Sequence, residues 1–375
     1  MNPQTIKKEN NKVSFGCWEA VSLIIVLICN KIFLNFPRRV AEEAGTAGWL
    51  MTIYVSLVAI FLFFLISVLF KKFEGKDILD ISEFVAGKAG RVIIGIVFLI
   101  ILIFTVSIVL RQFAENIKII SLPLTPLSIV TFLFVIGIIT GASLGLEPIM
   151  RISVLIVPII IIGFLVILIS SSNYFEISNI TPIFGLGLDK IFLSGLNSLS
   201  IFSDFVILLF LPPFLKTHNN FKKTGYYSFI LSSIFLVLAS LSYLLIYQYP
   251  NSNENFLPIY QITRIISHGR FFQRVESVFL VLWVLSALLY LTMVFFFILH
   301  IFRKTFNLDY YKPLIPSFII IVFSLSMIPS NLTTAIEIES NYIRRWSWLI
   351  SFAGVIIVAL IAVIKKKFIK GRFSR

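Results

Sequence analysis

The stretch LICNKIFLNFPRRVAEEAG, residues 27–45, places a lysine and then a proline inside an apolar run that could otherwise cross a membrane. A charge near the centre of a bilayer costs roughly 2.5–3.5 kcal/mol on insertion scales and is usually kept for a functional reason. Pro37 cannot continue a helix without losing a backbone hydrogen bond. We therefore expect a membrane-spanning helix that is broken here, with Pro37 closing its outer half.

The whole chain has the composition of an integral membrane protein. Of its 375 residues, 58% are hydrophobic and 13% are charged, and the mean hydropathy is +0.98, far above the usage of soluble domains. The gaps between apolar segments are too short to hold a separate folded domain. We expect one polytopic membrane domain over residues 1–375, with 1–16 as a cytoplasmic N-terminus and 365–375 as a basic cytoplasmic tail.

Ten segments are long and apolar enough to cross a membrane when about 20 residues are allowed per crossing. The fourth segment is short, and its Gly137, Gly141 and Gly145 recur every four residues, a spacing that favours close packing against a neighbouring helix. The predicted spans are residues 17–36, 46–70, 92–117, 127–142, 152–171, 192–212, 226–247, 275–301, 313–330 and 346–364.

The positions of lysine and arginine orient these spans. With the N-terminus in the cytoplasm, 21 of the 32 basic residues fall on the cytoplasmic side and nine on the other, while Lys31 and Arg111 remain inside the membrane. The positive-inside rule therefore places both termini in the cytoplasm. The tail KKKFIKGRFSR then serves as an orientation and lipid-headgroup anchor, with docking to a protein as the alternative.

Five spans in each half would make the second half enter the membrane from the opposite side, as in inverted-repeat transporters. The mark of that architecture is a broken helix at spans one and six. Span six has a glycine, three serines and an aspartate between Gly195 and Asp204, which is a poor composition for a helix that faces lipid. We predict an all-α fold of two five-span repeats, residues 17–171 and 192–364, with spans one and six broken.

Four stretches carry a resemblance to a known family. They are FPRRVAEEAGTAGW after span one, LRQFAENIKIISLPLTP after span three, GLEPIMRIS between spans four and five, and FFQRVESVFLVLWVL at the start of span eight. Over essentially its whole length the chain resembles the B subunit of spore germinant receptors, the endospore germination permeases of the amino acid/polyamine/organocation transporter superfamily.

The resemblance implies a leucine-transporter-type fold that binds a small germinant, usually an amino acid, in a central pocket between spans one, three, six and eight. It also implies germinant receptor A and C subunits as partners and the spore's inner membrane as the location. Two departures are visible. Asn30, Lys31 and Ile32 stand where the superfamily commonly has a Gly-x-Gly break, and Asp204 stands where the family has a glutamate.

Lys31 and Asp204 are the candidate charged groups of this pocket. Lys31 lies near the outer end of span one, so its side chain could instead snorkel to the interface, and Asp204 could have a purely structural partner. Trp283, Ser286 and Tyr290 share one face of span eight, a pattern that usually indicates packing. The residues expected to bind ligand are Asn30, Lys31, Ile32, Phe33, Ser107, Ser200, Ser203, Asp204 and Trp283.

Other polar residues have structural interpretations. Ser107, Arg111 and Glu115 share one face of span three, so Arg111 either meets a ligand carboxylate or is satisfied by Glu115. Arg274 and Glu276 point about 200° apart on a helix and cannot pair with one another, so we expect each to hold span eight against a different neighbour. The residues expected to be structural are Pro37, Arg111, Glu115, Arg274 and Glu276.

Several functional classes have no support in the sequence. Two cysteines and three histidines without ligand spacing argue against a metal centre, and Cys17 and Cys29 are too far apart along one helix to form a disulfide. No nucleotide-binding signature or catalytic triad is present, so we expect neither an enzyme nor a bound cofactor. The net charge of +14 follows from the cytoplasmic basic residues and does not indicate nucleic acid.

Two function classes remain. The first is a germinant-sensing receptor subunit, in which ligand binding shifts a conformational equilibrium that partner subunits read. The second is a free-standing proton- or sodium-coupled amino acid transporter, and a germinant-gated ion channel is a weaker third. In the first class we expect Lys31 and Asp204 to pair in the unliganded protein. A zwitterionic ligand would compete for them, with its ammonium going to Asp204 and its carboxylate to Lys31 or nearby backbone amides.

Overall fold

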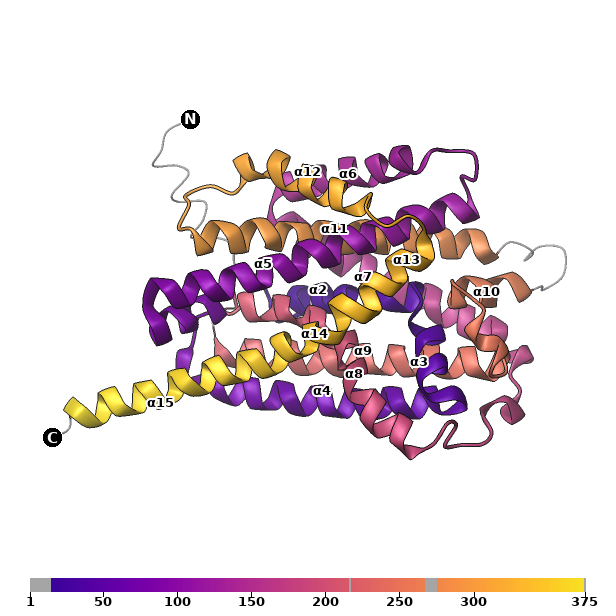
Figure 1. Ribbon diagram of the computed structural model, residues 1–375, viewed down its shortest axis with the longest axis horizontal. Helices are drawn as coiled ribbons and strands as arrows, with labels where there is room; N and C mark the ends of the chain where they lie inside the picture. Colours follow the sequence, from indigo (N-terminus) through magenta and orange to yellow (C-terminus); the bar gives the residue numbers. More distant parts are fainter. Residues whose placement is uncertain (1–14, 216, 267–274, 374–375) are drawn as a thin grey trace.

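The chain folds into a bundle of long helices that lie along the longest axis of the molecule (Figure 1). The computed structural model describes residues 15–215, 217–266 and 275–373, and every regular element in these ranges is helical, as predicted. The α-helices are α2 (Cys17–Cys29), α3 (Phe36–Ala44), α4 (Gly48–Phe70), α5 (Ile78–Ile120), α6 (Leu127–Leu144), α7 (Leu146–Ser171), α8 (Gly195–Ser198), α9 (His218–Ile246), α10 (Pro258–Ile265), α11 (Val275–Thr305), α12 (Ile315–Ser326), α13 (Leu332–Glu337), α14 (Arg345–Trp348) and α15 (Val355–Phe373).

Stretches of 3₁₀ or π geometry connect or continue these helices. The 3₁₀ stretches are η1 (Asn30–Phe33), η2 (Gly45–Ala47), η3 (Lys71–Phe73), η4 (Ser172–Tyr174), η5 (Ile177–Ile180), η7 (Leu199–Phe210), η8 (Asn251–Asn253) and η9 (Lys312–Leu314). The π stretches are η6 (Lys190–Ser194), η10 (Ile338–Arg344) and η11 (Leu349–Gly354).

Eight helices in the described ranges are long and apolar enough to cross a membrane. The other two of the ten predicted spans correspond to the broken first span, α2 with η1, and to the 12-residue α12. The chain is therefore a multi-pass membrane protein in which two of the apolar segments are shorter than a full crossing.

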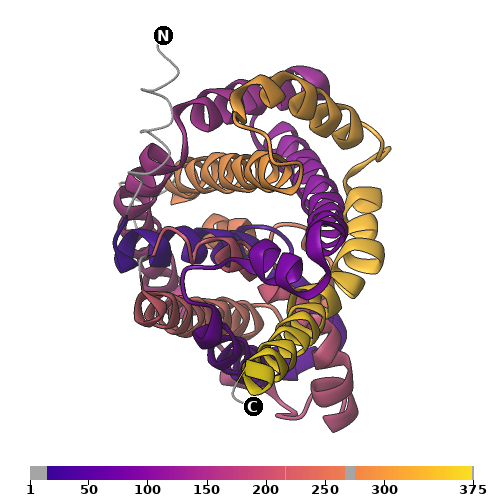
Figure 2. The same cartoon turned by 90° about the vertical axis from the view of Figure 1, so that its left-hand side faces the viewer.

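Two groups of four spans form the body of the protein. The segments α2, α4, η7 and α9 pack on one another, and α5, α6, α11 and α12 form a second group, which the end view shows as two layers (Figure 2). Each group takes two spans from the first half and the two equivalent spans from the second half. Spans five and ten connect the groups, because α7 packs on α2 and α11, and α15 packs on α4 and α5. This arrangement is the one that two five-span repeats produce.

Both predicted helix breaks are present. In span one the α-helix ends at Cys29, continues as the 3₁₀ turn η1 and leaves helical geometry at Leu34, where φ is −98° and ψ is −135°. Span six changes from π geometry in η6 to α in α8 and then to a 12-residue 3₁₀ run in η7. Because 3₁₀ runs longer than three or four residues are uncommon, span six is as irregular as span one.

The role of Pro37 differs from the predicted one. The break in span one precedes it, and Pro37 occupies the first turn of α3. At that position the missing N–H of proline breaks no helical hydrogen bond and its fixed φ suits the helix. Pro37 therefore begins the short helix α3 and does not close the outer half of span one.

The tenth span begins well before the predicted residue 346. Asn331 caps α13 by accepting a hydrogen bond from the backbone N–H of Thr334 at 2.8 Å. The helix then continues through η10, α14 and η11 to Phe373. The predicted outer loop 331–345 is thus almost entirely helical. Arg344, which lies in this predicted outer loop, is buried.

The predicted cytoplasmic loop 71–91 is also mostly helical and is tied to span eight. Asp77 and Asp80 form a reciprocal capping box at the start of α5. Lys304 of α11 contacts both carboxylates, Asp77 at 2.5 Å and Asp80 at 2.8 Å. Burial raises the pKa of Asp77 to about 6, against the opposing effect of the Lys304 charge. The start of α5 and the end of α11 are therefore held together by charge.

The first lysines of the basic tail contact the protein itself. Lys365 donates to the carbonyl oxygens of Phe84 and Val85 at 3.0 and 2.9 Å, immediately before the point at which α5 leaves helical geometry. Lys366 donates to the carbonyl oxygen of Lys72. The start of the tail thus supplies hydrogen-bond donors to backbone groups near the start of α5, a role that the lipid-anchor interpretation did not include.

The glycines of span four pack as predicted at two of three positions. A Cβ atom on Gly137 or Gly141 would lie 2.8 Å from Leu288 or 2.5 Å from Thr292, both on α11. Gly145 instead joins α6 to α7 with a φ of +95°, a conformation that glycine adopts readily.

Replacing Gly225 with alanine tests the packing of α4 against α9. The added Cβ atom would lie 1.8 Å from the ring of Phe63, which is fully buried. We expect Gly225→Ala to lower the free energy of unfolding by about 1–3 kcal/mol, as overpacking of a well-filled core does. Thermal unfolding in detergent measures this. Gly354→Ala is the matched control, since its nearest contact would be the Leu349 carbonyl oxygen at 3.7 Å. Equal unfolding temperatures for the two variants would contradict the packing.

Candidate functional site

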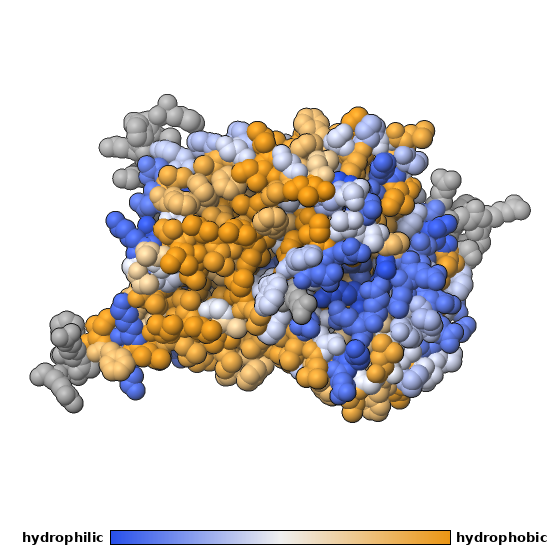
Figure 3. All heavy atoms as spheres, viewed as in Figure 1, coloured by the Kyte–Doolittle hydropathy of each residue, from blue (hydrophilic) through white to orange (hydrophobic). Residues whose placement is uncertain are grey.

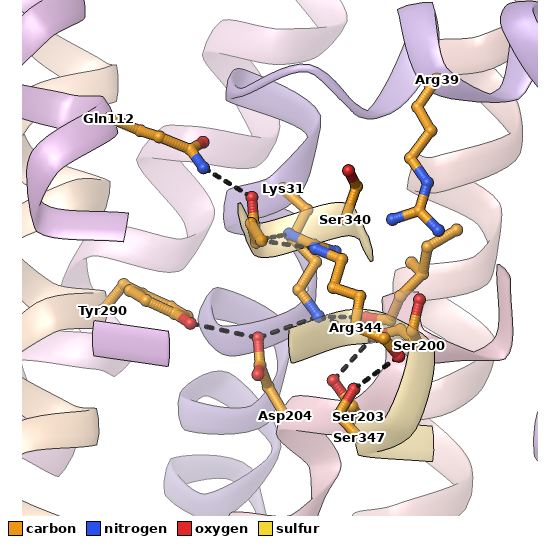
Figure 4. Close-up of polar contacts among 12 residues, drawn as sticks. Lys31, Arg39, Gln112, Ser200, Ser203, Asp204, Tyr290, Ser340, Arg344 and Ser347 are labelled. Atoms are coloured by element: carbon orange, nitrogen blue, oxygen red, sulfur yellow. Dashed lines mark hydrogen bonds and ion pairs between the residues drawn. The ribbon is translucent and has the colours of Figure 1, made fainter. Parts of the chain in front are cut away.

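The two helix breaks face one another through a buried ion pair. Lys31 of η1 and Asp204 of η7 lie 2.9 Å apart, and their side chains are only 5% and 6% exposed. Figure 4 shows the two side chains reaching toward each other. The predicted pairing of Lys31 with Asp204 is confirmed, and Lys31 does not snorkel in this structure.

The Lys31 ammonium is fully occupied by oxygen atoms of span six. Besides Asp204, it donates to the backbone carbonyl oxygens of Ser200 at 3.4 Å and Ile201 at 2.5 Å. An ammonium group has three N–H donors, so these three acceptors use all of them. Lys31 therefore fixes the break of span one directly against the 3₁₀ run of span six.

Asp204 also contacts span eight. The Tyr290 hydroxyl of α11 donates to Asp204 Oδ2 at 3.3 Å. Nearby, the Ser203 hydroxyl donates to the Ser200 carbonyl oxygen at 2.7 Å, and the Ser200 hydroxyl is buried without a hydrogen-bond partner in the described ranges. The carboxylate thus lies where spans one, six and eight meet, beside one unused polar atom.

A second buried ion pair, which was not predicted, lies beside the first. Glu339 and Arg344 of η10 are 2% and 7% exposed. Arg344 donates through Nε to Glu339 Oε1 at 2.6 Å and through Nη2 to the same oxygen. Gln112 of span three donates to Glu339 Oε2 at 2.7 Å. Span ten and span three therefore contribute charged and polar groups to the same central region.

The two pairs interact electrostatically. The charge of Arg344 acts on Asp204, and the charge of Glu339 acts on Lys31. Two positive and two negative side chains cancel, so the region as a whole carries no net charge. Burial of single charges is costly, and mutual pairing with hydrogen bonds offsets that cost.

The first break also borders a small, mainly apolar cavity. Ile32 and Phe33 line it, together with Cys29 and apolar residues of α7 and α9. Asn30 accepts a hydrogen bond from the Ser286 hydroxyl at 3.1 Å. Of the four predicted ligand residues in η1, Lys31 is thus the one whose side chain contacts Asp204.

Two other predicted ligand residues make contacts with residues other than Lys31 and Asp204. The Ser107 hydroxyl donates to the Ile103 carbonyl oxygen of its own helix at 2.7 Å. Trp283 packs between the rings of Phe113 and Phe279, with centroid distances of 5.4 and 6.0 Å. From span three, Gln112 contacts the second ion pair through Glu339.

The structural predictions have mixed outcomes. Arg111 pairs with Glu115 at 2.7 Å and also donates to the Ser326 carbonyl oxygen at 3.3 Å, so the self-satisfied interpretation is confirmed. Glu276 is half-buried in the first turn of α11, and Arg274 lies outside the described residues. No group of three or more histidine, cysteine, aspartate or glutamate side chains in the described residues could hold a metal ion.

A hydrophilic surface patch lies beside the charged region. The apolar surface in Figure 3 is interrupted on its right-hand half by a blue patch over α3 and the η10 part of span ten. Arg39 of α3 and Ser340 of η10 lie close to the two ion pairs in Figure 4. A polar solute therefore has a hydrophilic surface next to the site.

Comparison with known proteins gives consistent results. A family model described as spore germination protein matches residues 17–335. Spore germination protein A2 of Bacillus subtilis (strain 168) is 24% identical over 95% of this chain and 98% of its own length, and YndE is 26% identical over 84% and 86%. Spore germination protein B2 is 26% identical over 61% of this chain, a match that spans 62% of B2.

A solved structure shares the fold. It is a sialic acid symporter coupled to Na⁺, in a substrate-bound outward-open state, with a TM-score of 0.61 and 13% sequence identity over 91% of this chain and 79% of the symporter. The fold is thus the leucine-transporter type, as expected. At this identity the likeness concerns the fold alone.

Proposed function

Because this chain belongs to the spore germination protein family, we propose that it is the germinant-sensing subunit of a spore germination receptor. It binds a small germinant of the amino acid class between the broken helices and signals to A and C partner subunits. The observation that supports this most is the Lys31–Asp204 pair, which joins the two breaks inside the bundle.

The buried pair supplies a mechanism for sensing. A ligand ammonium competes with Lys31 for the Asp204 carboxylate. Weakening that ion pair loosens the only charged link in the described structure between the break of span one and span six. A ligand shifts a conformational equilibrium only by its difference in affinity for the two states. Such a difference arises when the ligand ammonium replaces the Lys31 ammonium at Asp204.

The same proposal sets the location of the protein. The chain lies in the spore's inner membrane with both termini in the cytoplasm, as its basic residues favour. The A and C subunits then receive the conformational change through the membrane domain or at its surfaces.

An amino acid transporter is the alternative, and the fold shared with a Na⁺-coupled symporter favours it. Binding and uptake separate the two functions. We expect the receptor, purified with its partner subunits, to be stabilised against thermal unfolding by one or a few L-amino acids and by none of the nucleosides. We expect the same amino acids not to accumulate in proteoliposomes under a proton or sodium gradient.

The outcomes of this test are distinct. Stabilisation by nucleosides and by no amino acid would contradict the proposed ligand class. Gradient-dependent uptake would favour the transporter. Liposomes without protein control for leakage of the amino acid.

A further inference from the structure

The Glu339–Arg344 pair depends on an unusual helix geometry. In an α-helix, residues five apart are separated by about 140° around the axis, so their side chains do not meet. In a π-helix the hydrogen bonds run between residues five apart, which brings such residues to the same face. The π stretch η10 contains both Glu339 and Arg344, and its geometry therefore holds the guanidinium in place.

Arg344 keeps hydrogen-bonding capacity that Lys31 lacks. A guanidinium has five N–H donors in a planar fork. Two of its nitrogens bind one oxygen of Glu339, while the other oxygen of Glu339 accepts from Gln112. The pair is thus not the two-oxygen arrangement that makes arginine–carboxylate pairs strong. Donors of Arg344 remain for a further carboxylate.

Lys31 is less suited to bind a ligand carboxylate. All three of its donors are used in the unliganded protein, two of them by carbonyl oxygens of span six. Displacement from Asp204 frees a single N–H, which cannot bind both oxygens of a carboxylate. The planar fork of arginine can bind both oxygens of a carboxylate at once.

Arg344 also lies in the right place. It interacts electrostatically with Asp204, and η10 and α14 pack against η7, which contains Asp204. Figure 4 shows the Arg344 side chain close to that of Lys31, which pairs with Asp204. The guanidinium therefore lies beside the ion pair at which the ligand ammonium is proposed to bind.

We propose that Arg344 binds the carboxylate of the ligand and that Glu339, held by Gln112, is its positioning residue. The ligand class is a small molecule that carries both an ammonium and a carboxylate, an α-amino acid. This assignment rests on the proposed binding of the ligand ammonium at Asp204. From the sequence, we expected the ligand carboxylate to bind Lys31 or nearby backbone amides. Arg344 takes that role in this proposal.

The test compares each amino acid with its α-amide, which keeps the ammonium and side chain but has no negative charge. Binding to the purified receptor with its partner subunits is measured by calorimetry. We expect the wild-type protein to prefer the acid over the amide by between about 10-fold and 100-fold, the range for a hydrogen bond to a charged group. Arg344→Lys should reduce this preference several-fold or more, because the second donor of the fork is lost.

A double variant separates the loss of carboxylate binding from a loss of folding. Glu339→Gln with Arg344→Gln removes both charges together, so no single charge is left buried. It should bind acid and amide equally. Arg111→Lys is the matched control, since Arg111 is an equally buried arginine paired on its own helix; it should keep the wild-type preference.

Several results would overturn the assignment. If the wild-type protein binds the amide as tightly as the acid, the assignment is wrong, and no variant is needed to show it. If the Arg344→Lys protein keeps the full preference for the acid, the assignment is also wrong. Both results leave the proposed function intact. Absence of binding by every amino acid and every amide would instead count against the proposed function.

Discussion

Spores whose receptor carries Asp204→Asn are expected to lose their response to amino acid germinants. Asparagine keeps the shape of the side chain but removes the charge that attracts an ammonium. Hydrogen bonds to charged groups contribute about 1.5–3 kcal/mol, so the affinity should fall by between about 10-fold and 100-fold. The germination response at concentrations that saturate the wild type, and ligand binding by the purified receptor, measure this loss.

Folding must be measured alongside, because Asp204→Asn leaves the Lys31 ammonium buried without its counter-charge. Removal of one partner of a buried pair costs about 3–5 kcal/mol. Asp309→Asn is the matched control, since it makes the same chemical change at an exposed residue between α11 and α12. A folded Asp204→Asn protein that binds the ligand with wild-type affinity would show that Asp204 does not bind the ligand ammonium.

Lys31→Met is expected to impair both stability and response. The change removes the counter-charge of Asp204 and the donor to the Ser200 and Ile201 carbonyl oxygens, while the Tyr290 hydroxyl stays. The free energy of unfolding should fall by about 3–5 kcal/mol. Dose–response curves and unfolding temperatures measure the two effects.

The exposed Lys88 provides the control for this change. Lys88→Met should behave as the wild type in both measurements. An Lys31→Met protein with unchanged unfolding temperature would contradict the structural role of the ion pair.

Much of the fold follows from the sequence because the bilayer imposes strong rules. Apolar length located the spans. The cost of a buried charge predicted that Lys31 needs a partner, and the inverted repeat placed Asp204 close enough to be that partner. The spacing of four residues likewise predicted the Arg111–Glu115 pair, which is present.

The second ion pair could not be found by the same reasoning. The polar stretch 337–345 resembles a loop, and Glu339 and Arg344 would lie on different sides of an α-helix. Their contact arises only in π geometry, which no simple sequence pattern predicts. One signal was available. After Asn331, a good helix cap, no glycine or proline occurs until Gly354, so nothing in the sequence ends the helix.

Local hydrogen bonding explains the other differences. Serine in a helix often donates to a carbonyl oxygen of the preceding turn, and Ser107 does so. Proline fits the first turn of a helix as well as it ends one, so Pro37 was compatible with both a stop and a start. The neighbouring Leu34, which leaves helical geometry, settles this in favour of a start.

The double variant Lys31→Met with Asp204→Asn tests the central claim most directly. Because both charges of the pair are removed together, it should be more stable than either single variant. Ligand binding and the germination response are measured over the concentration range that activates the wild type. We predict a folded receptor that shows neither. A folded double variant that responds to the same ligand at the same concentration would show that neither residue recognises the ligand. The proposed binding of the ligand at this ion pair would then be wrong.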